Sequence, residues 1–295
     1  MPHDDYSSPG FERMGRRRPS RRVIRSLADL TPSPAAAAAF EQRTGEPAPE
    51  FREPGLQELF DRGIIQTVVR QLKSGKEATV YVARGADGAV AVKVYHDHHT
   101  RGFRNDAVYR EGRFVGNTRL ERAMAQGSTK GLRAHQGLWV EREYRELALL
   151  HSAGVRVPQP LGHAGQAIAM EFVGRDAEPA PRIAEARLTV QDTKDALEQA
   201  VRNLAAIVAC GCIHGDYSAF NLLWWERTLV VIDLPQLVHI SESRHAARLL
   251  ARDIHSLCTT FSRFNIPINR REITRTIVGS DGGRLPSSPF RTLLG

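Results

Sequence analysis

The segment that most constrains this chain is HGDYSAFN, from His214 to Asn221, together with VVIDLPQ at residues 230–236. Asp216 and Asn221 are five positions apart, in a loop between an expected helix and an expected strand. Asp233 directly follows an apolar stretch, which places its carboxylate at the end of a strand. The chain must therefore fold so that a helix, a loop and two short strands bring these three side chains together.

The spacing of Asp216 and Asn221 is that of the catalytic loop of protein kinases, where the Asp accepts a hydroxyl proton and the Asn holds a metal. Asp233 has the position of the metal-binding Asp of kinases. Asn221 and Asp233, together with phosphate oxygens of ATP, suffice to hold Mg²⁺. Upstream, strand alternation in AVAVKVY aims Lys93 away from the apolar face, where the kinase lysine contacts phosphates. Glu143, on the next expected helix, is expected to pair with Lys93.

The loop expected over the phosphates, SGKEA at residues 74–78, has one glycine and fits neither the glycine-rich loop of ordinary protein kinases nor a Walker loop. It is similar to the corresponding loop of the RIO family of atypical kinases, and the resemblance covers about residues 56–265. The motifs that carry it are KSGKEATVYVA (73–83), AVKVY (91–95), FRNDAVYREGRF (103–114), WVEREYREL (139–147), HGDYSAFNLL (214–223), IDLPQ (232–236) and ARDIHSLCTTFSR (251–263).

This resemblance implies a kinase that uses ATP with Mg²⁺ or Mn²⁺ and phosphorylates serine or itself. It implies Asp216 as the catalytic Asp, Lys93 as a catalytic residue that binds phosphates, and Asn221 and Asp233 as metal ligands. Some family members use the metal-loop Asp as a phosphate acceptor and behave as ATPases, which makes Asp233 a second catalytic candidate. The other residues expected to bind ATP are Ser74, Gly75, Lys76 and Glu77 near the phosphates, Glu143, and Met170, Glu171 and Val173 on the adenine side.

The expected fold is α+β, with a small β-rich N-lobe and a mainly helical C-lobe. Strands are expected at 64–72, 78–84, 90–95, 167–173, 222–225 and 229–232, and helices at 138–152, from a capping Asp192 to Gly211, and at 242–261. The expected domains are a disordered Arg-rich arm (1–55), an N-lobe (56–173) with a flexible loop (96–136), a C-lobe (174–285) and a tail (286–295). Too few residues follow Asp233 for a long activation segment, and no A-P-E motif is present.

Charge and composition bear on partners and location. The net charge is +8, and residues 1–26 carry seven Arg against three acidic residues. Such an arm is equally compatible with binding to RNA or a ribosomal particle and with a solvated tail. The sequence has no apolar run of membrane-spanning length, no signal-peptide pattern and only three cysteines. We therefore expect a cytoplasmic protein without a membrane partner, acting on a protein substrate that the motifs do not identify.

Two other functions share part of this pattern. Small-molecule phosphotransferases of the aminoglycoside or choline kinase type also contain H-G-D, but usually lack K-E-A in the phosphate loop and Pro-Gln after the metal-binding Asp. A nucleotide-switch scaffold that binds RNA through the arm is the other alternative. Within the motifs, His214 and Asp253 are expected to orient the catalytic loop through hydrogen bonds.

Overall fold

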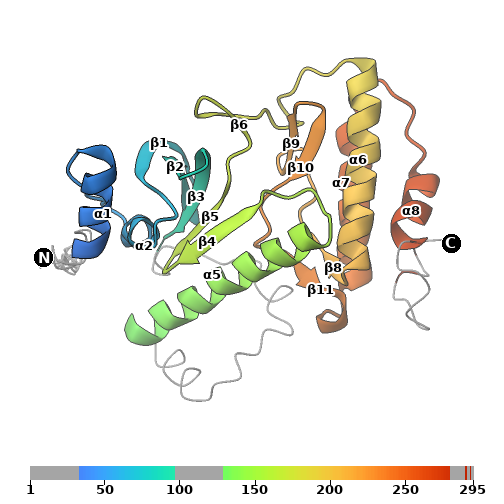
Figure 1. Ribbon diagram of the computed structural model, residues 1–295. Helices are drawn as coiled ribbons and strands as arrows, with labels where there is room; N and C mark the ends of the chain where they lie inside the picture. Colours follow the sequence, from blue (N-terminus) through green and yellow to red (C-terminus); the bar gives the residue numbers. More distant parts are fainter. Residues whose placement is uncertain (1–32, 97–128, 280–289, 291–292, 294–295) are drawn as a thin grey trace, which may run out of the picture.

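The computed structural model describes residues 33–96, 129–279, 290 and 293. Its smaller lobe is an antiparallel sheet with strand order β1-β2-β3-β5-β4, and the larger lobe that follows is mainly helical (Figure 1). The five strands are β1 (Thr67–Ser74), β2 (Ala78–Arg84), β3 (Ala89–Tyr95), β4 (Pro160–Ala164) and β5 (Ala167–Glu171). The two-lobed α+β fold expected from the sequence is therefore confirmed.

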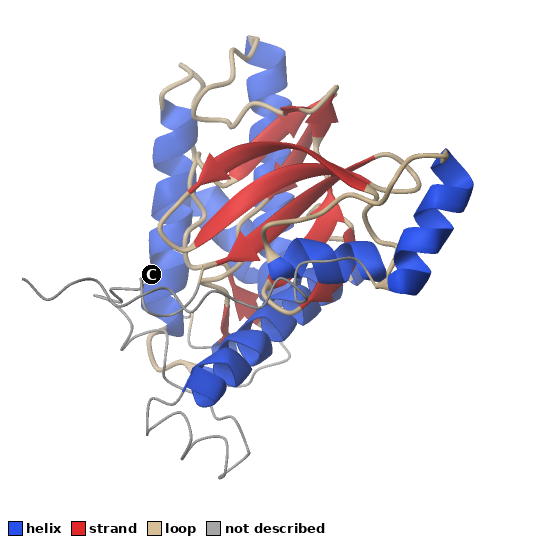
Figure 2. Cartoon of the chain, turned by 90° about the vertical axis from the view of Figure 1, so that its left-hand side faces the viewer, coloured by secondary structure: helices blue, strands red, loops and turns tan. Residues whose placement is uncertain are grey.

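Alternation along β3 divides the sheet into an apolar face and a face toward the larger lobe. Val90, Val92 and Val94 are buried in a cluster with Leu59 and Phe60 of α2 (Pro54–Asp61). Lys93 lies on the opposite face, as the period of two predicts. Viewed from the α1 side, the sheet lies in front of the long helices of the larger lobe (Figure 2).

Residues 33–55 are folded, so the prediction of a disordered arm is wrong for this part. Helix α1 (Pro34–Thr44) begins at the N-cap Ser33, whose Oγ accepts a hydrogen bond from Ala36 N. Phe40 and Phe51 are buried against Phe60, with ring centroids 5.6 and 5.5 Å apart. Isolated aromatic residues give no periodicity in the sequence, yet each buries a large apolar area here. Residues 1–32 of the predicted arm lie outside the described residues.

Helix α5 (Thr129–Ser152) begins earlier than predicted, so residues 129–136 are helical and not part of the expected loop. Residues 97–128 of that loop lie outside the described residues. Strand β4 was not predicted, because its sequence PLGHA has no clear alternation. The bounds of two other strands differ from the prediction. The strand expected at 64–72 is β1 at Thr67–Ser74, and the strand expected at 167–173 is β5, which ends at Glu171.

The larger lobe packs around α6 (Val190–Ala209) and α7 (Ala246–Ser262), whose apolar residues are mostly buried in one core. The N-cap of α6 is Thr189, which corrects the expected cap at Asp192. The remaining elements are β6 (Gly174–Arg175), β7 (Glu178–Pro179), β8 (Cys212–Ile213), β9 (Leu222–Trp225), β10 (Thr228–Val231), β11 (Val238–His239), the 3-10 helix η3 (Ile240–Glu242) and α8 (Arg270–Gly279). Helix α8 was not predicted, and its sequence is rich in Arg. The short span between Asp233 and α7 contains only β11 and η3, as the spacing predicted.

Candidate active site

A cleft of about 880 Å³ lies between the sheet and the larger lobe. Its lining comes from β1, β2, β3, β5, α5 and the segments that flank β9 and β10. The predicted site residues that line it are Gly75, Lys76, Glu77, Lys93, Glu143, Met170, Glu171, Val173, Asn221 and Asp233. Ser74 is bonded through Oγ to Thr79 Oγ1 (3.0 Å) at the base of the β1–β2 turn. Gly75 N closes this turn by donating to Ala78 O (2.9 Å).

Lys93 lies between two carboxylates at the inner end of the cleft. Its Nζ is 3.1 Å from Glu143 Oε1 and 2.7 Å from Asp233 Oδ1, which confirms the predicted Lys–Glu pair. Burial alone would lower the pKa of Lys93, but the charges of Glu143 and Asp233 raise that pKa well above its ordinary value. The ammonium group therefore stays charged, and a fixed cation of this kind attracts phosphate oxygens.

Asp216 and Asn221 are joined directly within the catalytic loop. Asn221 Nδ2 donates to both the carboxylate Oδ2 and the backbone O of Asp216, each at 2.9 Å. These bonds fix the amide so that its oxygen is the atom left for a cation. Asp216 is exposed, so its carboxylate is accessible to a hydroxyl group of a substrate.

Two buried side chains hold this loop in shape. Asp253, on α7 and 1% exposed, accepts hydrogen bonds from Gly215 N (2.8 Å) and Tyr217 N (3.2 Å). His214 Nε2 is 3.2 Å from Ile232 O, and its Nδ1 accepts from Asp216 N at 3.3 Å. Gly215 has φ +81°, and a Cβ there would lie 2.6 Å from the backbone oxygen of Gln236. The orienting roles predicted for His214 and Asp253 are confirmed.

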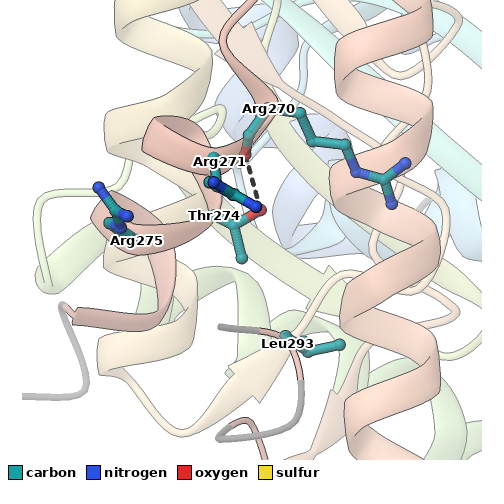
Figure 3. Close-up of a pocket in the computed structure, with 5 residues that line it drawn as sticks. All are labelled: Arg270, Arg271, Thr274, Arg275 and Leu293. Carbon is teal, nitrogen blue, oxygen red and sulfur yellow. Dashed lines mark hydrogen bonds between the residues drawn. The ribbon is translucent and has the colours of Figure 1, made fainter. Parts of the chain in front are cut away.

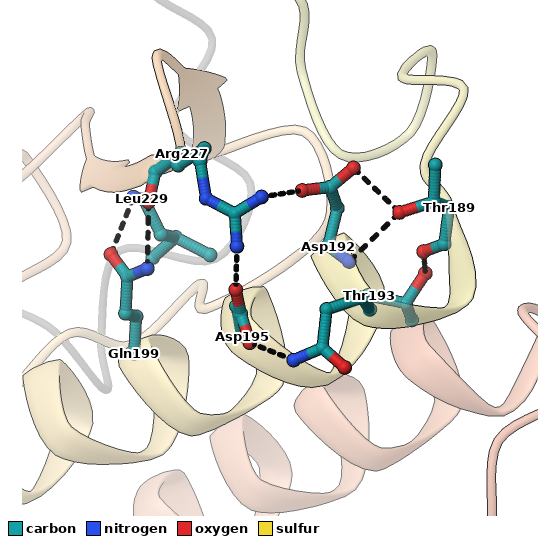
Figure 4. Close-up of polar contacts among 8 residues, drawn as sticks. Thr189, Asp192, Thr193, Asp195, Gln199, Arg227 and Leu229 are labelled. Atoms are coloured by element: carbon teal, nitrogen blue, oxygen red, sulfur yellow. Dashed lines mark hydrogen bonds and ion pairs between the residues drawn. The ribbon is translucent and has the colours of Figure 1, made fainter.

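The β9–β10 hairpin is tied to α6 by side-chain contacts at its turn (Figure 4). At the hairpin turn, Arg227 bonds Asp192 Oδ1 at 3.2 Å and also pairs with Asp195. Gln199 bonds the backbone where the turn enters β10, accepting from Leu229 N and donating to Arg227 O, both at 2.9 Å. Because Asn221 precedes β9 and Asp233 follows β10, both lie at the open end of the hairpin.

Asn221 and Asp233 offer oxygen ligands of the kind that Mg²⁺ prefers. Burial would raise the pKa of Asp233, but the charge of Lys93 and its hydrogen bond outweigh burial, and the pKa lies below its ordinary value. The carboxylate is thus ionised at neutral pH, and 47% of the side chain is exposed. Asp233 also has φ +67°, a strained conformation for a residue with a Cβ that occurs often at functional sites. An ion held here would complete its shell with phosphate oxygens and water.

The Glu171 carboxylate, predicted to lie on the adenine side, is already engaged. Arg156 donates to both carboxylate oxygens at 2.8 Å, and Gln159 N donates at 3.0 Å. The hydrogen bonds from Arg156 hold the pKa of Glu171 below its ordinary value, although burial opposes this. The side chain of Glu171 is therefore structural, so any nucleotide contact there would come from its backbone. Met170 and Val173 supply apolar lining.

The sequence motifs and the cleft agree with a match to a known family. Residues 79–273 match the family model described as the RIO domain. The chain belongs to the RIO family of serine/threonine-protein kinases. This RIO chain is 32% identical over 230 residues to the RIO-type serine/threonine-protein kinase Rio1 of Haloferax volcanii, covering 77% of this chain and 74% of that protein. It is 30% identical over 211 residues to serine/threonine-protein kinase RIO1 of Caenorhabditis elegans, covering 71% of this chain but only 40% of the nematode protein.

The fold is also similar to a solved RIO structure. The crystal structure of the Rio2 kinase-ADP/Mg²⁺-phosphoaspartate complex from Chaetomium thermophilum gives a TM-score of 0.56 at 19% identity. The comparison covers 87% of this chain and 80% of the Rio2 chain. At this identity the similarity supports the shared kinase-like fold.

One residue of the RIO site was missed by sequence analysis. Tyr95 is 1% exposed, and its hydroxyl donates a hydrogen bond to Glu143 Oε2. Its ring centroid is 5.1 Å from Lys93 Nζ. Its place in the sequence could have indicated this role. Tyr95 comes two residues after Lys93 on one strand, so both side chains lie on the same face of the sheet. Tyr95 thus fixes the carboxylate that in turn fixes Lys93.

A second cavity, of about 330 Å³, lies at α8 and contains none of the predicted site residues. It is lined by Arg270, Arg271, Thr274, Arg275 and Leu293. Figure 3 shows the three guanidinium groups pointing in different directions, so they do not converge on one anion. We therefore place the active site in the cleft between the lobes.

Among the helices that the structure describes, none combines the length and apolarity needed to cross a membrane.

Proposed function

We propose that this RIO chain is an ATP-dependent serine/threonine kinase that transfers the γ-phosphoryl group with Mg²⁺ or Mn²⁺. The observation that carries the proposal is Lys93, paired with both Glu143 and Asp233 at the inner end of the cleft. Asp216, the proposed catalytic residue, is bonded to Asn221, which lines the same cleft as Lys93. Family membership favours this activity over the small-molecule phosphotransferases suggested by H-G-D alone.

Each side chain has a distinct role in the proposed transfer. Lys93 binds phosphate oxygens and offsets their charge. Asn221 and Asp233 would hold the metal ion, which would supply further positive charge at the phosphates. Asp216 orients the acceptor hydroxyl and takes its proton as the hydroxyl oxygen bonds to the γ-phosphorus. The bond from the γ-phosphorus to the bridging oxygen breaks, and ADP leaves.

A second activity, ATP hydrolysis through an aspartyl-phosphate, is favoured by the exposure of Asp233. The Rio2 structure named above is described as an ADP/Mg²⁺-phosphoaspartate complex. In this chain Asp233 is ionised, half exposed and directed into the cleft. Its carboxylate oxygen would bond to the γ-phosphorus, ADP would leave, and water would then release phosphate and restore the carboxylate.

The substrate and partners of the proposed kinase follow from its activity and its charge. The acceptor is a serine of this chain or of another protein. Contact with RNA or a ribosomal particle rests on the Arg-rich sequence of residues 13–25, which lie outside the described residues. A scaffold that binds RNA and uses ATP as a switch remains the alternative if turnover is slow.

The test is to incubate the protein with Mg²⁺ and γ-labelled ATP and to follow label on protein and as free phosphate. Asp216→Ala removes the proposed proton acceptor, and Asp87→Ala, in an exposed turn between β2 and β3, is the matched control. Acid-stable label that is absent from Asp216→Ala supports a kinase. Hydroxylamine-labile label that is absent from Asp233→Asn supports the ATPase. Equal label in the wild type and Asp216→Ala would refute the kinase mechanism.

A further inference from the structure

A second carboxylate on α5 is buried away from the cleft lining. Glu146 lies one turn after Glu143 and is 8% exposed. Its Oε1 accepts from Arg142 Nε at 2.7 Å and is 3.6 Å from His239 Nε2. A buried carboxylate needs charged or hydrogen-bonding partners to remain stable, so both contacts matter to its placement.

The partners of α5 lie in the short span that follows Asp233. His239 ends β11, and Glu242 of η3 is 3.3 Å from Arg142 Nη2. Arg142, Glu146, His239 and Glu242 thus form a cluster of alternating charges, which we call the α5–β11 cluster. It joins the helix that carries Glu143 to the chain that carries Asp233. Ordinary kinases have a long activation segment in this part of the sequence.

We propose that Glu146 and His239 are positioning residues that hold α5, and with it Glu143, against the catalytic half of the cleft when His239 is protonated. Neither side chain lines the cleft, so both act through the placement of Glu143 and Lys93. This inference rests on the proposed phosphoryl transfer and adds to it a dependence on pH.

The surroundings of His239 favour its charged form. Charged or titratable groups face it from three elements: Glu146 and Arg142 from α5, Glu242 from η3, and Cys212 from β8, whose Sγ is 3.6 Å from His239 Nδ1. The Glu146 carboxylate, 3.6 Å away, raises the pKa of His239 above its ordinary value, although burial and Arg142 oppose it. Burial raises the pKa of the Cys212 thiol to about 12, so the thiol stays neutral in this range.

The sign of the pH dependence follows from that shift. A histidine with a raised folded pKa stabilises the folded arrangement while it is charged, and this contribution is lost as pH rises through the folded pKa. The Glu146–His239 pair is therefore complete at mildly acid pH and weakens toward alkaline pH. The Glu143 side chain should therefore be held most firmly at mildly acid pH and less firmly as pH rises.

The experiment measures kcat at saturating ATP from about pH 6 to pH 9, a range that spans histidine titration. The variants are His239→Gln, which removes the charge, His239→Lys, which keeps it throughout, and His255→Gln, an exposed control on α7. The ratio of wild-type kcat to His239→Gln kcat should be about two- to fivefold at low pH and fall toward one at high pH, the range for a partly exposed ion pair. The ratio of His239→Lys to His239→Gln should stay constant.

A separate readout tests the pairing without turnover. The His239 ring, assigned by comparison with His239→Gln, should titrate by NMR above its ordinary pKa and return toward it in Glu146→Gln. If the pKa of His239 equals the ordinary value, the inference is overturned. If that pKa is raised but the ratio of wild-type to His239→Gln kcat does not change with pH, the inference is also overturned. Turnover of ATP in either case would still uphold the proposed function. No turnover in the wild type at any pH would remove both.

Discussion

Replacing Asp253 with Ala should destabilise the protein and disorder the catalytic loop together. Asp253 accepts from Gly215 N at 2.8 Å and Tyr217 N at 3.2 Å, and it is 1% exposed. A buried donor that loses its acceptor costs about 1–3 kcal/mol, so two donors cost about 2–6 kcal/mol. For a chain of this size, each kcal/mol lowers the melting temperature by about 2–4 °C. Turnover should fall by about 10²-fold, because a shift of about 1 Å in a catalytic group has that effect.

Thermal unfolding followed by circular dichroism, together with ADP formation, measures both effects. Asp253→Asn keeps one acceptor oxygen and should lose roughly half as much stability, and it provides a folded protein if Asp253→Ala fails to fold. Asp87→Ala, in an exposed turn, is the control. If Asp253→Ala changed the free energy of unfolding by no more than about 0.5 kcal/mol, the usual range for surface substitutions, and left turnover unchanged, the role given to Asp253 would be refuted.

Three further predictions follow from the site and the fold. Lys93→Ala should lower kcat and weaken ATP binding, because Glu143 and Asp233 lose the cation between them, and unchanged kinetics would contradict this. Phe40→Ala should destabilise the packing of α1 by about 3 kcal/mol, which faster hydrogen exchange of α1 amides would reveal, whereas unchanged exchange would show that α1 does not depend on this ring. Generic Ser/Thr peptides should be poor substrates, because the span from Asp233 to α7 is too short for a peptide-docking segment, and rapid turnover of such peptides would count against this.

The catalytic motifs could be predicted because their geometry is local. Asp216 and Asn221 are close in sequence, and a loop of that length brings them within hydrogen-bonding distance. The Lys93–Glu143 pair spans 50 residues, yet it was predicted because the order of motifs indicates a kinase fold. The roles of His214 and Asp253 followed from the same comparison.

Contacts between distant segments that no motif records were not predictable. The Glu146–His239 contact joins α5 to β11 and depends on how the lobes pack, which no periodicity reports. The burial of Phe40 and Phe51 against α2 also depends on how these segments pack in the folded chain. Tyr95 shares a face with Lys93, but only the position of α5 brings its hydroxyl to Glu143.

The most direct test of the account is the rate of ADP formation and the affinity for ATP in Asp216→Ala. The account predicts that kcat falls by about 10²–10⁴-fold, the range for loss of a general base, while ATP binding changes little. Asp216 bonds Asn221 but is not paired with Lys93, so nucleotide binding should survive its removal. An Asp216→Ala protein that keeps the wild-type rate would contradict the proposed mechanism.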